Sequence, residues 1–201
     1  SKRGRQRILD TLAGAGNGLV VQPLFETIDR LTENVKVIEC EIEKLVAGDK
    51  VVELLETIPG CGPVTACTIR AYTDDIQRFS NHKKYASYAG LAPWVQCSNE
   101  TEHYGRITKR GPEELRTAFV QLVVGIRRSR QSASWRLMER YEAMKTVKGS
   151  GKSIIATARK LSKIVWFMLM REEVFNVGLM TDDFLESKID SMRRTLNKIS
   201  A

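Results

Sequence analysis

The chain has 201 residues, 42% of them hydrophobic and 28% charged, and 32 Lys and Arg against 24 Asp and Glu give it a net charge of +8 at pH 7. This length suits one domain, or one domain with an appendage. The sequence has no apolar run of about 18 residues, which excludes a membrane-spanning helix. The excess of positive charge favours a polyanionic partner.

The N-terminus and the cysteines indicate the cellular context. The chain begins SKRGRQRILD, without Met and without the apolar core of a signal peptide, so we expect a piece of a longer protein. Its 4 Cys include no C-x-x-C pair, and with only 2 His the spacing of a metal site is absent. We therefore expect reduced thiols, no metal held by this chain and a cytoplasmic protein.

Residues 1–21 are first basic and then rich in Gly, which predicts a flexible tail. In residues 22–49 apolar side chains recur in alternating steps of four and three, the spacing of a coiled-coil seam. The seam residues are Leu24, Ile28, Leu31, Val35, Ile38, Ile42 and Leu45. Because this stripe is narrower than that of most core-facing helices, we favour a coiled coil, between chains or antiparallel within the chain, over a helix packed on its own domain.

The segment Val51–Tyr72 is predicted to form two short apolar helices around the turn IPGCG. Gly60 and Gly62 can take positive φ and allow close backbone approach, and Pro63 suits the first position of the second helix. This pattern is typical of a helix-hairpin-helix, whose turn amides and second helix point at a nucleic-acid phosphate. The alternative is an ordinary tight connection without a ligand.

Acidic and basic groups follow the hairpin. Asp74 and Asp75 have no local partner for metal binding, so we interpret them as a solvated turn or helix cap. Ser80 is expected to cap a helix over residues 81–89, which carries Lys83 and Lys84 beside two tyrosines. Two interpretations of this helix stay equally open. It contacts a phosphate backbone, or it is an ordinary surface helix with half-buried tyrosines.

The stretch from Gly90 to Gly111 has no helical period, and a loop of this length inside a compact domain is usually functional or disordered. Its aromatic residues argue against disorder, and a short β-ribbon is possible. The loop places the hydroxyl of Ser98 in one segment with several cations, as phosphoryl transfer requires. His103 is a possible base for that hydroxyl, although we prefer a loop histidine bonded to the backbone.

The remaining sequence predicts further helices, so we expect an all-α fold in which nearly the whole chain is helical. Their ranges are 112–130, 132–147 with Ser132 or Ser134 as cap, 153–171 and 182–198. The run GSGKS over 149–153 resembles part of a phosphate-binding loop, but Thr146 stands where the motif requires its first Gly. We therefore reject nucleotide binding, and leave open a helix N-terminus touching a nucleic-acid phosphate.

Four segments in this order resemble insertion-sequence transposases of the type guided by a bridge RNA. They are TIPGCGPVTACTIRAY, FSNHKKYASYAGLAP, the Ser98 loop ending in GRITKRG, and ELRTAFVQL. The resemblance covers about Val51 to Arg171. It implies that residues 50–201 form the helix-hairpin-helix transposase domain, that 22–49 form the coiled coil joining the family's two domains, and that an RNase H-like domain with four acidic metal ligands is missing from this chain.

The resemblance also implies a mechanism. In the family a Ser between GLAP and the ITK motif attacks a DNA phosphate, and by position that nucleophile is Ser98. Family members commonly have a Ser-Ser-Gly-Gly-type stretch here, where this chain has Asn99, Glu100 and Glu102. The implied partners are DNA, a bridge RNA and further copies of the chain in a bacterial or archaeal nucleoid, with Mg²⁺ expected in the full-length protein.

The sequence thus predicts one catalytic residue, Ser98, and a set of nucleic-acid-binding residues. The binding residues are Gly60, Gly62, Thr65, Lys83, Lys84, Arg106, Thr108, Lys109, Arg110 and Arg116. Two other functions fit part of the pattern: a non-catalytic helix-hairpin-helix module that positions DNA for another enzyme, and a helical oligomerisation domain. The Ser98 loop favours the transposase, because a pure binding module needs no nucleophile.

Overall fold

The computed structural model of the chain describes residues 2–13, 18–98, 101–129 and 135–176. It is mostly helical, which confirms the predicted fold class. The chain divides into two compact units, Ser1–Ala47 and Gly48–Ala201, and each is described by itself. No helix in the described ranges is long and apolar enough to cross a membrane.

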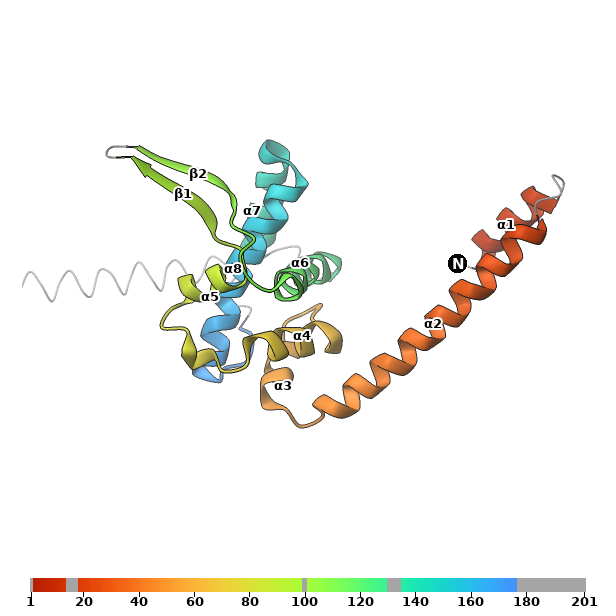
Figure 1. Cartoon of the computed structure of the whole chain (residues 1–201), viewed down its shortest axis with the longest axis horizontal. Helices are drawn as coiled ribbons and strands as arrows, with labels where there is room; N and C mark the ends of the chain where they lie inside the picture. Colours follow the sequence, from red (N-terminus) through yellow and green to blue (C-terminus); the bar gives the residue numbers. More distant parts are fainter. Residues whose placement is uncertain (1, 14–17, 99–100, 130–134, 177–201) are drawn as a thin grey trace, which may run out of the picture. The chain divides into compact units, whose positions relative to one another are not determined.

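The first unit consists of α1 (Lys2–Ala13) and α2 (Gly18–Val46) (Figure 1). The prediction of a flexible tail is wrong for α1, because Arg, Gln, Leu and Ala favour helix and outweigh the single Gly4 inside it. The helix is held to α2 by Arg5, which pairs with Asp29 and lies over the ring of Phe25.

Helix α2 begins at Gly18, before residue 22 where the coiled coil was predicted to start, so Pro23 lies inside the helix. The predicted seam is exposed in this chain: Leu24, Leu31 and Ile38 expose 58%, 56% and 59% of their surface. Because α1 contacts α2 through Phe25 and Asp29 instead, it leaves the seam open.

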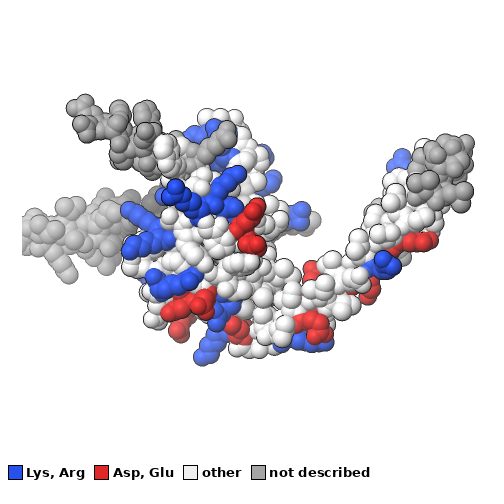
Figure 2. All heavy atoms as spheres, in the orientation of Figure 1, with Lys and Arg blue, Asp and Glu red and all other residues white. Residues whose placement is uncertain are grey.

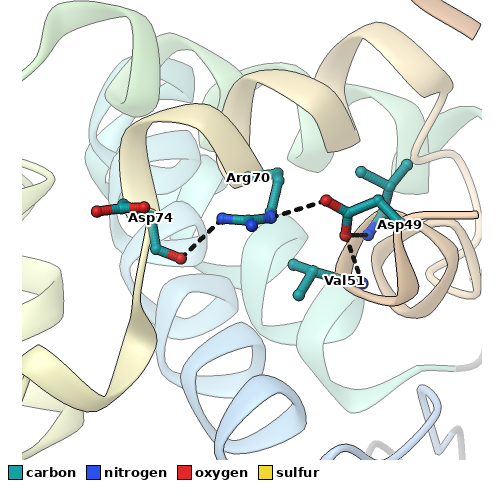
Figure 3. A network of polar contacts seen from close by, with 5 residues as sticks. Asp49, Val51, Arg70 and Asp74 are labelled. Carbon is teal, nitrogen blue, oxygen red and sulfur yellow. Dashed lines mark hydrogen bonds and ion pairs between the residues drawn. The ribbon is translucent and has the colours of Figure 1, made fainter. Parts of the chain in front are cut away.

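The second unit begins with α3 (Lys50–Glu56) and α4 (Pro63–Thr73). Asp49 caps α3 by accepting from the amides of Val51 and Val52. Figure 3 shows how Arg70 of α4 ties the two helices, with Nε 3.0 Å from Asp49 Oδ2 and Nη1 2.8 Å from the carbonyl of Asp74. Partial burial tends to raise the pKa of Asp49, but Arg70 and the two amides together lower it.

The turn after α4 confirms our interpretation of the two aspartates. Asp74 ends α4 with φ at +55°, and Asp75 caps the short 3₁₀ helix η1 (Ile76–Arg78) by accepting from an amide. The next helix, α5 (His82–Tyr88), is capped by Asn81 and not by Ser80, because Asn81 Oδ1 accepts from the Lys84 amide.

A two-stranded antiparallel ribbon follows, as the sequence allowed. It is formed by β1 (Pro93–Ser98) and β2 (Thr101–Ile107). Pro93 pairs with Ile107 at the foot of the ribbon, and Ser98 pairs with Thr101 at its tip. The ribbon extends away from the helices of this unit (Figure 1).

Three longer helices complete the second unit: α6 (Glu113–Arg128), α7 (Arg136–Lys148) and α8 (Ser150–Arg171). The predicted apolar stripe of α6 is confirmed as core, since its members Leu115, Phe119, Leu122 and Ile126 are fully buried. Helix α6 packs on α4 and α8, while α8 also contacts α5 and α7.

Two predicted helix starts are wrong. Trp135 occupies the N-cap of α7, where we expected Ser132 or Ser134, and its buried ring anchors that end in the core. Helix α8 begins at Ser150 rather than Ser153. Gly149, with φ at +80°, is the single residue that connects α7 to α8, so no further residues are needed for the turn. The predicted helix over 182–198 lies outside the described residues.

Candidate nucleic-acid interface

The turn between α3 and α4 packs directly on the backbone of α6. Gly60 has φ at +84°, and a Cβ atom there would lie 2.3 Å from the carbonyl carbon of Gly125. The reverse also holds, since a Cβ at Gly125 would lie 2.1 Å from the carbonyl oxygen of Gly60. Gly60 therefore serves close helix packing, a role that the sequence motif did not reveal because Gly125 is distant in the chain.

Gly62 differs from Gly60. Its φ of −89° is negative, so the positive φ considered for it does not occur, and it occupies the N-cap of α4 before Pro63. Nothing lies within 4 Å of the position of its missing Cβ, and Thr65 in the same turn is partly exposed. The N-terminus of α4 is thus accessible, and its contact with a phosphate stays a prediction.

Helix α5 separates its tyrosines from its lysines. Tyr85 is fully buried and lies 2.7 Å from Thr73 through their hydroxyl oxygens, and Tyr88 donates to the carbonyl of Tyr72 over 3.1 Å. The tyrosines hold α5 against α4, so their role is packing. Lys83 and Lys84 are exposed and available to a ligand.

A further cation beside α5 was missed by the sequence analysis. The guanidinium of Arg78 stacks on the rings of Phe79 and Tyr88, each centroid 4.6 Å away, and donates to the carbonyl of Tyr72. Its side chain is exposed although its position is constrained by these contacts. Only the tertiary contact with Tyr88 distinguishes Arg78 from an ordinary surface arginine.

The foot of the ribbon is built from two close glycines. A Cβ at Gly111, where φ is +122°, would lie 1.8 Å from the carbonyl oxygen of Tyr88, and one at Gly90 would lie 2.7 Å from Arg116 Nη1. Arg116 also donates weakly to the carbonyl of Lys109, at 3.4 Å. Both ends of the predicted loop are therefore fixed on the helical body, with Arg116 supporting them.

Positive charge is concentrated at this foot. Lys109, with φ at +52°, and Arg110 are exposed, and the amide of Thr108 donates to the carbonyl of Ala92 over 2.9 Å. The Thr108 hydroxyl oxygen is shielded and has no hydrogen-bond partner among the described residues. Figure 2 shows Lys and Arg side chains on the side of the unit that carries α5 and the ribbon foot.

Ser98 lies at the other end of the ribbon. The run from Pro93 to Ser98 spans about 17 Å at about 3.3 Å per residue, so Lys109 and Arg110 are far from the predicted nucleophile. This separation results from antiparallel pairing, because most of the predicted loop forms two extended strands. The side chains of Ser98, His103 and Arg106 lie outside what the structure describes, and their predicted roles remain predictions.

Comparison with known proteins shows what the central segment resembles. Residues 52–142 match the model of the Transposase IS116/IS110/IS902 family. The chain is 23% identical over 188 residues to a probable family 20 transposase of Pseudomonas aeruginosa, covering 89% of this chain and 56% of the relative. It is 28% identical over 146 residues to the transposase for insertion sequence element IS1328 of Yersinia enterocolitica, covering 73% and 44%.

A third relative is the pilin gene-inverting protein of Moraxella lacunata, with 34% identity over 126 residues, or 61% of this chain and 38% of the relative. The chain thus spans about half or less of the length of these relatives. The matched segment contains most of α3 and all of α4, α5, the ribbon and α6. Residues 52–142 of the chain are therefore similar to the transposase domain of the IS116/IS110/IS902 family.

Proposed function

We propose that this chain is the C-terminal part of a DNA recombinase in which Ser98 is the nucleophile. The observation that carries the proposal is the position of Ser98 at the tip of a ribbon that extends from a basic foot, within a transposase domain. A residue at the tip of the ribbon can reach a phosphate while Lys109 and Arg110 hold the duplex elsewhere. Gene inversion, named for one relative, is also DNA strand exchange.

The proposed reaction conserves phosphodiester bonds. Ser98 Oγ bonds to a backbone phosphorus, the bond from phosphorus to one deoxyribose oxygen breaks, and the Ser98 proton passes by way of a base to that oxygen. In the second step a deoxyribose hydroxyl of another strand attacks the phosphoserine and releases Ser98 with its proton. A serine hydroxyl is weak at its free pKa and needs such a base.

The proposal includes two components outside this chain, a guide RNA and Mg²⁺. Within the described ranges no three His, Cys, Asp or Glu side chains form a group that could hold a metal ion. We therefore assign no Mg²⁺ ligand to the described residues, and no step above depends on one. Bridge-RNA guidance is supported by the sequence resemblance alone.

We expect the chain to bind DNA or structured RNA with an affinity that falls steeply with salt, because phosphate contacts release counterions. Arg110→Ala is expected to weaken binding to all duplexes alike and to lower the salt slope by about one, since one cation is removed. Fluorescence anisotropy titrations across salt concentrations measure both quantities.

Lys50→Ala is the matched control for Arg110→Ala. Lys50 is exposed at the start of α3, away from the ribbon foot (Figure 1), and its loss removes the same charge. A salt slope that Arg110→Ala and Lys50→Ala lower equally would assign the effect to net charge. Absence of binding at low salt would reject the nucleic-acid interface.

We further propose that the seam of α2 forms a coiled coil with a second copy of the chain. The seam is apolar, has heptad spacing and remains open beside α1. Leu31→Asp or Ile38→Asp is expected to dissociate the assembly, because either places a charge in the buried interface. Sedimentation velocity measures the change in mass.

Glu33→Asp is a suitable control for the seam variants, since Glu33 lies in the same helix but off the seam and is exposed. It keeps the charge of the helix and is expected to leave the mass unchanged. If wild type and Leu31→Asp sediment alike, α2 does not associate through this seam.

A further inference from the structure

Helix α8 carries an unusual distribution of charge. Its sequence contains five cations and no acid, the cations being Lys152, Arg159, Lys160, Lys163 and Arg171. Three lysines of α2 and α7 each pair with a glutamate one turn away, in the pairs Lys36–Glu33, Lys44–Glu41 and Lys145–Glu142. Among the described residues, Arg159, Lys160 and Lys163 form no ion pair, so their charge is left for a partner outside the described residues.

Aromatic contacts join this charged helix to α5. The ring of Phe167 lies 5.7 Å from that of His82 and 4.9 Å from that of Trp166, whose Nε1 donates to the carbonyl of Phe79. The ammonium of Lys163 lies over Phe167 at 5.9 Å. These contacts fix the first turn of α5, including exposed Lys83, beside the cations of α8.

The positive charges of α5 and α8 act on one another. The pKa of His82 is held below its usual value by partial burial and by three cations. These are Lys163, Lys83 and Arg159. A positively charged surrounding favours the neutral form of the imidazole.

The same holds where α8 meets α7. The pKa of Lys160 is lowered by partial burial and by the charges of Arg140, Arg136 and Lys163. Mutual repulsion among cations on packed helices destabilises the free protein, and a polyanion relieves it.

We propose that these cations form a second binding surface for the phosphate backbone of a nucleic acid, here named the α8 track. The track consists of Lys83, Arg140, Arg159, Lys160 and Lys163, and runs from α5 across α8 to α7. This proposal rests on the proposed function, because it assumes a nucleic-acid substrate. It adds a binding surface centred on α8, a helix that lies outside the matched segment 52–142. Its continuity with Lys83 favours the backbone of a long polyanion over a small phosphate ligand.

The test is a double variant, Arg159→Gln with Lys163→Gln, in the whole chain. Both side chains are exposed, so the thermal unfolding curve should match wild type. Binding to a duplex DNA, a single-stranded DNA and a structured RNA is measured by anisotropy across salt concentrations. For the duplex, the salt slope is expected to fall by about 1.8, because each lost phosphate contact removes about 0.9. Whichever of the three probes shows the loss identifies the kind of strand bound.

The matched control is Lys36→Gln with Lys44→Gln, which removes the same charge from α2, where each lysine already has an acidic partner. Equal slopes for the α8 variant and this control on every probe would overturn the track. If Arg110→Ala still weakens binding in that case, the proposed function stands without the track. If the α8 variant unfolds, Lys83→Gln with Arg140→Gln tests the same surface from its two edges, and an unchanged slope there also overturns it.

Discussion

Ser98→Ala is expected to abolish strand exchange by the complete transposase, by at least about a thousandfold, while DNA affinity changes by less than about twofold. The reason is chemical, because the hydroxyl forms a covalent bond and a methyl group cannot replace it. Binding energy comes from many phosphate contacts, of which one neutral hydroxyl is a small part. Recombination is measured on supercoiled donor and target DNA with guide RNA and Mg²⁺ present, and affinity by anisotropy.

Ser80→Ala provides the control, since Ser80 is an exposed serine before α5 that the proposed reaction does not use. A nicked substrate should trap a protein–DNA adduct, which mass spectrometry should map to Ser98 in wild type and fail to detect in Ser98→Ala. Recombination by Ser98→Ala at the wild-type rate would reject the nucleophile. The chain would then be better described as a non-catalytic module that binds DNA.

Gly60→Ala is expected to destabilise the second unit by about 3–5 kcal/mol, at the upper end of single substitutions. Its Cβ would lie 2.3 Å and 2.5 Å from the carbonyl carbon and oxygen of Gly125. Both are backbone atoms of the long helix α6 and cannot turn aside as a side chain can. Its positive φ adds about 1–2 kcal/mol for any residue with a Cβ. The free energy of unfolding is measured by urea denaturation with the helical circular dichroism signal.

Gly62→Ala is the matched control, two residues away in the same turn. At Gly62 the φ is negative and the Cβ position is empty, so stability should change by less than about 1 kcal/mol. Equal stabilities of the two variants would contradict the close approach of Gly60 to Gly125. DNA binding by Gly62→Ala then tests the predicted phosphate contact at α4 without loss of fold.

Local patterns were enough to predict most of the helical fold. The apolar stripe of α6, from Leu115 to Ile126, is a property of neighbouring turns and needs no knowledge of what covers it. The turn from α3 to α4 and the cap at Asp75 also depend only on residues that are close together in the sequence. The predicted tail is a helix over Lys2–Ala13, because the helix-forming residues of this segment precede the glycines that begin at Gly14.

The predicted site was only partly assembled by the fold. Sequence placed Ser98, Lys109 and Arg110 in one loop, and strand pairing put them at opposite ends of a ribbon. Gly60, predicted to bind nucleic acid, packs closely on Gly125, and its contact with a phosphate stays a prediction. The contact of Gly60 depends on a residue that is distant in sequence, and the separation of Ser98 from the cations depends on the pairing register of the two strands. Neither can be read from composition or local spacing.

The amino-acid sequence by itself determined the helical class, the heptad seam of α2 and the turn between α3 and α4, because each depends on residue type and on spacing within a few turns. The nucleophile Ser98 is implied by the resemblance to insertion-sequence transposases and stays a prediction. Only the tertiary structure decided which cations share a surface and which glycine is packed. Arg159 and Lys163 of α8, Lys83 of α5 and Arg140 of α7 have no common motif. They lie in one region because buried apolar faces pack α5 and α7 against α8. The positions of these charged side chains are a consequence of that packing.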